Sequence, residues 1–232
     1  PPHRPYFGEG AFSPEVKRRW LDYYEDVAVL AFPEPAKDER IADSDEKAHY
    51  TRAPYSSRPG TKQFLPAPAA VAAPRPGIDR AKIVDLTGKL RPDGTLEWDV
   101  PAGRWTVMRF GARNNGAVTR PAPRPGLGFE CDKFDSEALK KHFANFQDRI
   151  FQALGPRPQC FGGLKYLHID SWEMGAQNWS DAFRAEFTRR RGYDPLPFYP
   201  VWEGRVVGDE NLSERFLWDL RLTAQELIVE NH

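Results

Sequence analysis

The fold class follows from the stretch Val27-Ala28-Val29-Leu30-Ala31-Phe32, six apolar residues in a row that are closed by a proline. A continuous apolar run of this length is typical of a strand that is buried on both faces, as in a parallel sheet. A helix is expected before it over residues 14–24, because Ser13-Pro14-Glu15 supplies a capping hydroxyl, a proline at the first helical position and an acid in the first turn. Helix followed by buried strand indicates an α/β fold.

The clearest helix downstream covers residues 135–154, where Asp135 can cap the N-terminus and Phe134 can pack onto Leu139 as a hydrophobic staple. Its apolar residues recur at three- and four-residue spacing at Leu139, Phe143, Phe146, Ile150 and Leu154. Further elements are predicted as a strand at 164–169, a helix at 181–191 with Gly192 at its end, and a last helix that Ser213 caps, with a Leu212 to Leu217 staple. This order is what part of a (β/α) barrel gives.

Long Pro-rich connectors and a small antiparallel β unit interrupt this order. The first connector shows no periodicity, and the β unit contains short β-type runs at 83–86, 96–100 and 105–110 that are separated by turn signals. We therefore expect a partial (β/α) barrel whose segments are a first barrel part at 1–33, a connector at 34–78, a β insertion at 79–133 and a barrel continuation at 134–232. Since the apolar stripe of the last helix still runs when the chain stops, we expect a piece of a longer protein.

Composition excludes several classes of function. The 232 residues are 40% apolar and 13% aromatic, which is enough for a core, and the 33 basic residues balance the 33 acidic ones. A zero net charge argues against nucleic acid as a partner, and no apolar run approaches the roughly 18 residues of a membrane span. The two cysteines, Cys131 and Cys160, form neither a zinc pattern nor a disulfide framework. No sequence feature bears on the oligomeric state.

Polar and aromatic residues are densest at 168–179, directly after the predicted strand at 164–169. In a β/α barrel this position is the C-terminal mouth of a strand, where catalytic side chains gather. Partial burial of Glu173 against Trp172 would raise the pKa of its carboxyl group and let it act as a general acid. The candidates for stacking on a sugar or hydrogen-bonding its hydroxyls are Asp170, Trp172, Gln177, Asn178 and Trp179. The competing interpretation is structural, because acids after a strand often cap the next helix and tryptophans there often only pack.

Two smaller charged clusters have similar alternatives. In an extended segment Glu130 and Asp132 lie on one face, where two acids can bind a cation or sugar hydroxyls, whereas Asp132 and Lys133 can equally form a surface ion pair. The run Arg189-Arg190-Arg191 resembles an anion site, but it ends a predicted helix, where cations complement the helix dipole. We therefore treat the arginines as structural.

Several stretches resemble family 106 of the glycoside hydrolases, the α-L-rhamnosidases, and stand in the order of that family. The specific part is Asp170-Ser171-Trp172-Glu173 through Asn178-Trp179, with Phe187 and Arg190-Arg191-Gly192-Tyr193-Asp194-Pro195 after it. The weaker stretches are 26–33, 101–105 with 109–111, 128–133 and 204–205. The resemblance spans most of the chain, from about Trp20 onward.

The resemblance implies an enzyme with a β/α barrel that cleaves terminal α-L-rhamnosyl residues from a glycan or glycoside with inversion, with a calcium ion at the sugar site. By its position in the Ser-Trp-Glu phrase Glu173 matches the general acid, with Asp170, Trp172, Asn178, Trp179, Glu130 and Asp132 as the expected sugar-binding residues.

The family's general base lies on a later strand that has no counterpart in this chain, and the calcium ligands are unassigned. The chain alone is therefore expected to be inactive. The resemblance also implies a periplasmic or secreted enzyme. The alternative from another class is a non-catalytic carbohydrate-binding or structural barrel fragment.

Overall fold

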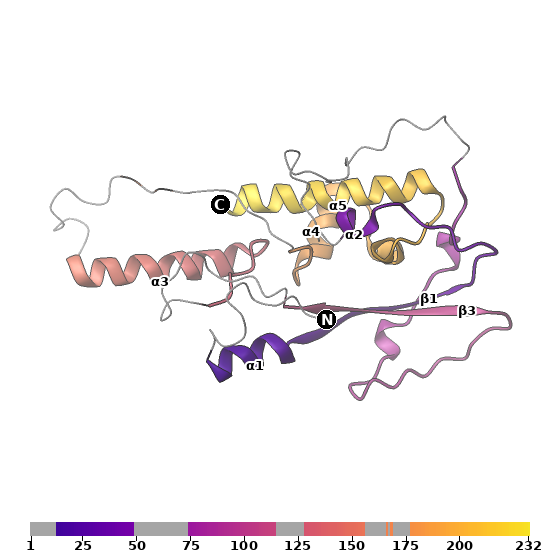
Figure 1. Cartoon of the computed structure of the whole chain (residues 1–232), viewed down its shortest axis with the longest axis horizontal. Helices are drawn as coiled ribbons and strands as arrows, with labels where there is room; N and C mark the ends of the chain where they lie inside the picture. Colours follow the sequence, from indigo (N-terminus) through magenta and orange to yellow (C-terminus); the bar gives the residue numbers. More distant parts are fainter. Residues whose placement is uncertain (1–12, 49–73, 115–127, 156–165, 167, 169–176) are drawn as a thin grey trace, which may run out of the picture.

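The computed structural model describes residues 13–48, 74–114, 128–155, 166, 168 and 177–232 (Figure 1). The helices and strands are α1 (Pro14–Asp22), β1 (Tyr24–Pro33), α2 (Ser44–Ala48), β2 (Val84–Asp85), β3 (Trp105–Arg113), α3 (Ser136–Leu154), α4 (Phe183–Arg191) and α5 (Glu210–Asn231). Three 3-10 helices join them, η2 (Arg80–Lys82), η3 (Thr87–Lys89) and η6 (Leu196–Glu203). The mixed helix and sheet content is confirmed, and the described residues do not form a barrel.

The sheet has three strands in the order β2-β1-β3, and both pairings are antiparallel. The predicted parallel sheet is therefore wrong, although the burial of β1 on both faces is confirmed. Ala28, Leu30 and Phe32 face the main core, whereas Val29 and Ala31 face a second small cluster around Leu86. A continuous apolar run reports that both faces are covered, and it carries no information on the direction of the neighbouring strands.

The sheet also joins two segments that were assigned to different parts of the chain from the sequence. β1 comes from the expected barrel part and β3 from the expected β insertion, and they pair from Tyr24↔Arg113 to Pro33↔Trp105. Of the three predicted β runs, 83–86 and 105–110 correspond to β2 and β3. The run at 96–100 is wrong as a strand, since only Leu96 forms a bridge, to Leu90. Its Trp98 instead packs edge-on against Trp105, with ring centroids 5.1 Å apart.

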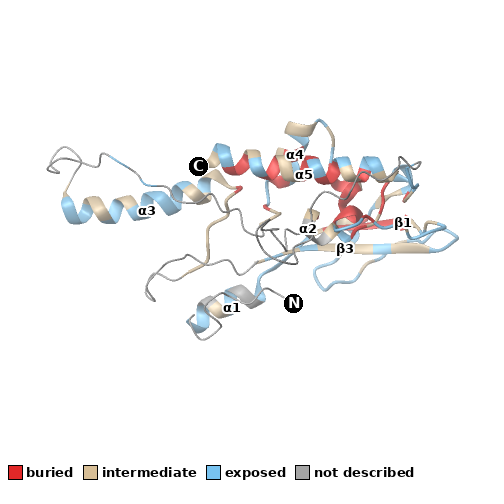
Figure 2. Ribbon diagram, turned by 45° about the horizontal axis from the view of Figure 1, so that its top comes forward, coloured by how far each residue is buried: buried red, intermediate tan, exposed pale blue. Residues whose placement is uncertain are grey.

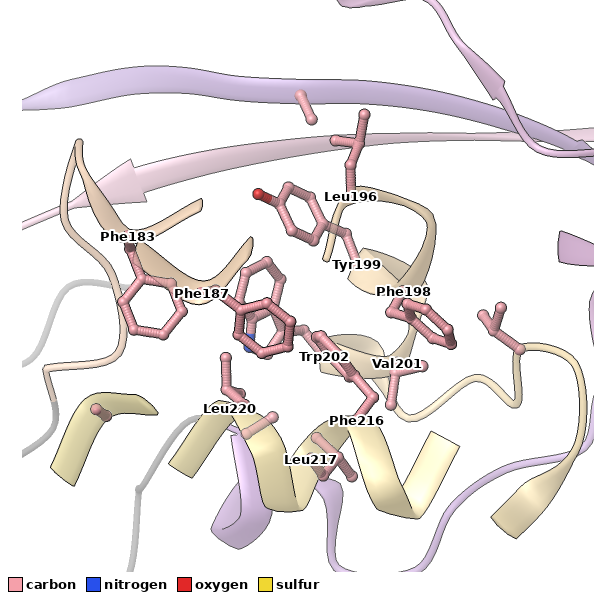
Figure 3. Packing of buried hydrophobic residues seen from close by; sticks show 14 of the residues in the cluster. Phe183, Phe187, Leu196, Phe198, Tyr199, Val201, Trp202, Phe216, Leu217 and Leu220 are labelled. Carbon is pink, nitrogen blue, oxygen red and sulfur yellow. The ribbon is translucent and has the colours of Figure 1, made fainter. Parts of the chain in front are cut away.

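The main core is an aromatic cluster between α4, η6 and α5. Figure 2 shows the buried residues gathered along α5 and β1, and Figure 3 shows the rings of α4, η6 and α5 facing one another. Phe198 stacks on Phe216 at a centroid distance of 5.2 Å, and Tyr199 packs on Trp202 at 4.5 Å. η6 was not predicted, because its apolar residues are nearly continuous and show no helical period.

α4 is tied to α5 by ion pairs as well as by apolar packing. The guanidinium of Arg190 donates to Glu230, with N–O distances of 2.5 and 2.7 Å, and Arg191 pairs with Glu226. The side chain of Arg190 is only 7% exposed. Arg190 and Arg191 are therefore paired with carboxylates of the neighbouring helix, which agrees with their interpretation as structural residues.

The N-terminal cap of α3 and the C-terminal end of α4 were predicted correctly, whereas α4 begins two residues later than predicted and the predicted start of α5 was wrong. Asp135 caps α3 by accepting a hydrogen bond from the Glu137 amide, and Gly192 ends α4 with φ = 79°. α5 begins four residues earlier than predicted, because Asp209 caps it in place of Ser213. The predicted cap, Ser213, is buried inside the helix, where its hydroxyl accepts from the Val207 amide at 2.8 Å and donates to the Val207 carbonyl at 2.9 Å.

The predicted apolar stripe of α3 is present, but no residue of this helix is buried. Phe146 is 62% exposed and Leu154 is 64% exposed. At the start of the helix Phe134 is buried and packs on Phe183, with centroids 5.6 Å apart. Periodicity therefore predicted the helix, while the described residues cover only its N-terminal end. No helix within the described ranges combines the length and apolar character that a membrane crossing requires.

The described end of the first connector is more than a plain linker. Pro76 forms an isolated bridge with Asp209, and Ile78 forms one with Val207. Between them the amide of Gly77 donates to the carbonyl of Gly208 at 2.9 Å. This pairing fixes the connector against the segment that leads into α5.

We expect Gly77→Ala to lower the free energy of unfolding by about 2 kcal/mol or more, because overpacking against backbone cannot be relieved by a side-chain rotation. A Cβ at this position would overlap the carbonyl group of Val206. Urea unfolding measures the effect. Gly88→Ala is the matched control, since no atom lies within 4 Å of a Cβ placed there. Equal urea midpoints for the two variants would show that the pairing around Gly77 is absent in solution.

Candidate functional site

The described residues line a cavity of about 470 Å³. Its walls come from residues 23 and 27 in and beside β1, the segment at 109–114 that includes the end of β3, the acidic segment at 130–132, the stretch at 177–181 and the end of η6 at 202–203. Five parts of the chain therefore meet at one place. A cavity of this size lies within the range that small ligands occupy in proteins.

Five of the predicted sugar-binding residues line this cavity together, namely Glu130, Asp132, Gln177, Asn178 and Trp179. The other predicted site residues, Asp170, Trp172 and Glu173, lie outside the described residues. So does most of the predicted strand at 164–169, of which the structure describes Tyr166 and His168 as exposed and outside regular secondary structure. The fold thus brings residues 130–132 and the described end of the 168–179 cluster, residues 177–179, to one cavity.

The acidic segment is held by hydrogen bonds to its own neighbours. The ammonium group of Lys133 lies 2.7 Å from the Glu130 carboxylate, and its side chain is only 15% exposed. Asp132 accepts a hydrogen bond from the Phe134 amide at 2.8 Å and another from the side-chain amide of Gln177. The carboxylates therefore stand at fixed positions in the cavity wall.

Asn178 and Trp179 line the cavity and also contact neighbouring parts of the fold. The amide nitrogen of Asn178 donates to the carbonyl of Ala48 in α2 at 2.9 Å. The Trp179 ring packs edge-on against Tyr199 and Trp202, with both centroid distances at 5.9 Å. The structural interpretation of these two residues is therefore supported, and sugar binding by their remaining surfaces stays a prediction.

An Arg–Asp pair in the sheet supports another wall of the cavity. The Arg109 guanidinium of β3 donates to both carboxylate oxygens of Asp26 in β1, at 2.6 and 2.8 Å. This pairing holds the pKa of the Asp26 carboxyl below its usual range. The Tyr24 hydroxyl donates to Asp26 at 2.8 Å, and its ring lies where a Cβ of Gly111 would stand.

The pairing of Asp26 with Arg109 was not predicted, because only the register of β1 and β3 brings these residues together. Tyr23 was not predicted as a site residue either, although it lines the cavity. The pKa of its hydroxyl is raised, first through burial and then through a hydrogen bond to Glu25. Burial also raises the pKa of the Cys131 thiol, so this cavity-lining cysteine stays protonated at neutral pH and is unsuited to act as a nucleophile.

Metal ligands are not evident in the part of the chain that the structure describes. Within it, no group of three or more His, Cys, Asp or Glu side chains lies together in a way that could hold a metal ion. The cavity wall therefore supplies carboxylates, amides and aromatic rings. This donor set suits a polyhydroxylated ligand, since hydroxyls donate to carboxylates while apolar sugar faces pack on rings.

Comparison with known proteins adds three findings. The family model described as alpha-L-rhamnosidase matches residues 9–232. A Formosa agariphila protein provisionally named a beta-glucuronidase is 36% identical over 220 residues, which cover 95% of this chain and 18% of that protein. The solved structure of a rhamnosidase from Novosphingobium sp. PP1Y superposes with a TM-score of 0.71 at 33% identity and covers 84% of this chain and 18% of that one. The chain thus spans less than a fifth of the length of either relative.

Proposed function

The chain belongs to the alpha-L-rhamnosidase family, family 106 of the glycoside hydrolases, and we propose that the full-length protein cleaves terminal α-L-rhamnosyl residues from a glycan or glycoside. The observation that carries the proposal is the extent of the family match, which includes every segment of the cavity wall. The resemblance identified from the sequence is thereby confirmed. From family membership alone we also propose that the enzyme works in the periplasm or outside the cell.

The proposed mechanism is inverting hydrolysis by two carboxyl groups. Glu173 protonates the leaving oxygen as general acid, and a general base from outside this chain activates water on the opposite face of the sugar. Two facts support the assignment of Glu173. It stands in the Ser-Trp-Glu phrase, and it precedes Gln177 of the cavity wall by only four residues. With one member of the pair, the isolated chain is expected to be inactive.

The cavity wall supports binding of a neutral sugar. Ring surface comes from Trp179 and Trp202, and carboxylates come from Glu130 and Asp132. We propose that ring hydroxyls donate to these carboxylates while the methyl-bearing side of rhamnose packs on the rings. Asp170 and Trp172, in the phrase that contains Glu173, are proposed to complete the sugar site.

The calcium ion implied by the family remains a proposal. The described acids do not form a cluster that fits it, because no group of three or more candidate ligands lies together among them. Its ligands would then come from residues beyond those described. We assign no step of the reaction to it.

The charge of the cavity favours a rhamnoside over a glucuronide, which is the substrate class suggested by the name of the Formosa agariphila relative. The charged residues that line the cavity are Arg109, Arg113, Glu130, Asp132, Asp181 and Glu203, which are two cations and four anions. The Arg109 guanidinium pairs with Asp26 and the Glu130 carboxylate pairs with Lys133, so pairing offsets one lining charge of each sign and the excess of two carboxylates among the described lining residues remains. An excess of carboxylates repels the carboxylate of a uronic acid, whereas it accepts hydrogen bonds from a neutral deoxy sugar.

A substrate panel on the full-length protein tests the proposal. We expect hydrolysis of an aryl α-L-rhamnoside and of a rhamnose-terminated disaccharide, with the β-anomer of rhamnose as the first product by NMR. An aryl β-glucuronide is expected to be cleaved at least about 100-fold more slowly. An uncompensated buried charge costs about 3 kcal/mol, and a barrier higher by that amount lowers a rate by about this factor. Faster cleavage of the glucuronide would contradict the substrate assignment. Binding of rhamnosides in calorimetry without any cleavage would instead favour the non-catalytic alternative.

A further inference from the structure

Gln177 connects two parts of the cavity wall, because it contacts residues that lie 44 and 45 positions before it in the sequence. Its Oε1 atom accepts a hydrogen bond from the backbone amide of Lys133 at 3.0 Å, and its Nε2 atom donates to the carboxylate of Asp132. The same Nε2 atom lies 3.3 Å from the carbonyl of Trp179. One side chain therefore joins the acidic segment to the stretch that follows the proposed general acid.

Only a primary amide of this length satisfies both partners. The backbone N–H of Lys133 requires an acceptor, and the carboxylate of Asp132 requires a donor, so the two ends of the amide are assigned without ambiguity. A glutamate at this position would face the Asp132 carboxylate with a second carboxylate. A side chain without polar atoms would remove both of these hydrogen bonds from half-buried partners, and Asp132 would keep only the one from the Phe134 amide among the described hydrogen bonds.

We propose that Gln177 is a positioning residue, which sets the place of the acidic segment relative to the residues that follow Glu173. This inference rests on the proposed function, because it concerns the same cavity. The amide makes its hydrogen bonds to protein groups, so its effect on the reaction passes through Asp132 and the backbone. Small displacements of groups that hold a substrate are costly, since an error of about 1 Å can lower a rate about 100-fold.

Gln177→Glu in the full-length enzyme gives a test with its own pH signature. At about pH 7.5 we expect kcat/KM to fall about 10- to 100-fold, because two carboxylates then face each other. The Asp132 carboxylate raises the pKa of the introduced carboxyl group, and the protonated form of that group can again donate a hydrogen bond. The ratio of variant to wild-type kcat/KM should therefore rise toward one at about pH 5. The titratable groups around this contact are Tyr23, Glu130, Cys131, Asp132, Lys133 and Asp181.

The native groups titrate in both proteins. Dividing the kcat/KM of the variant by that of the wild type at each pH therefore cancels their shared effect. Gln225→Glu, the same change on an exposed position of α5, is the matched control and should give a ratio near one throughout. A ratio near one for Gln177→Glu at about pH 7.5 would overturn the proposal. A reduced ratio that does not depend on pH would overturn it as well, because it would indicate a general loss of structure.

Thermal unfolding of the same variants separates this inference from the proposed function. Because the pKa of the introduced carboxyl group is raised in the folded state, its destabilisation should be present near neutral pH and should disappear as the pH falls through that pKa. If the wild-type protein cleaves no rhamnoside but the Tm difference of Gln177→Glu follows this pH dependence, the proposed function fails while the contact itself is supported. A Tm difference that is constant with pH would contradict the contact independently of any activity.

Discussion

Glu173→Gln in the full-length enzyme is expected to lower kcat/KM on a rhamnose-terminated disaccharide by about 10²- to 10⁴-fold, which is the usual contribution of a general acid. The amide has nearly the same shape as the carboxyl group but cannot protonate the leaving oxygen. An aryl rhamnoside with a very acidic leaving group needs no such proton, so its rate should fall far less. The measurement is kcat/KM for a series of rhamnosides that differ only in the pKa of the leaving group.

The dependence on the leaving group distinguishes loss of the proton donor from loss of structure. A general acid acts by proton transfer, so the slope of log kcat/KM against leaving-group pKa should become steeper in the variant. Glu137→Gln is the matched control, because Glu137 is exposed on α3 and its carboxylate pairs with the ammonium group of Lys140 on the same helix. Nearly equal losses on all substrates, or a near-normal rate on the disaccharide, would contradict the role of Glu173.

Local features of the fold were predictable from the sequence where one residue and its neighbours decide them. The cap of α3 at Asp135 and the end of α4 at Gly192 depend on contacts within a few residues, and both were predicted. The start of α5 shows the limit of this reasoning. Asp209 and Ser213 are both good capping residues, and the choice between them depends on the distant pairing of Pro76 and Ile78 with 207–209, which leaves Ser213 buried against Val207.

The same limit explains what was missed in the cavity. Composition singled out the acidic segment and the 168–179 phrase, because acids and tryptophans are dense in both. The pairing of Asp26 with Arg109 needed the register of an antiparallel sheet, and the sequence instead favoured a parallel one. Long-range pairing is set by the packing of whole faces, and no local pattern records it.

Phe187→Ala is expected to lower the free energy of unfolding by about 3–5 kcal/mol, the usual cost of removing a buried aromatic ring. Phe187 is fully buried, and its ring contacts Phe183, Tyr193 and Phe216 at centroid distances of 6.4, 5.1 and 5.8 Å. Each of these contacts is lost with the ring, and the cavity that remains is enclosed by rigid neighbours. Urea unfolding followed by tryptophan fluorescence measures the loss.

Phe146→Ala supplies the matched comparison, because it deletes the same ring from the apolar stripe of α3 at a residue that is 62% exposed. A ring that is already in contact with water contributes little to folding, so a loss of less than about 1 kcal/mol is expected. The two variants differ in burial and not in chemistry. If Phe146→Ala cost as much as Phe187→Ala, the stripe of α3 would have to be covered in solution, and its exposure among the described residues would not represent the folded chain. If neither variant cost more than about 1 kcal/mol, the aromatic cluster between α4, η6 and α5 would not be the core.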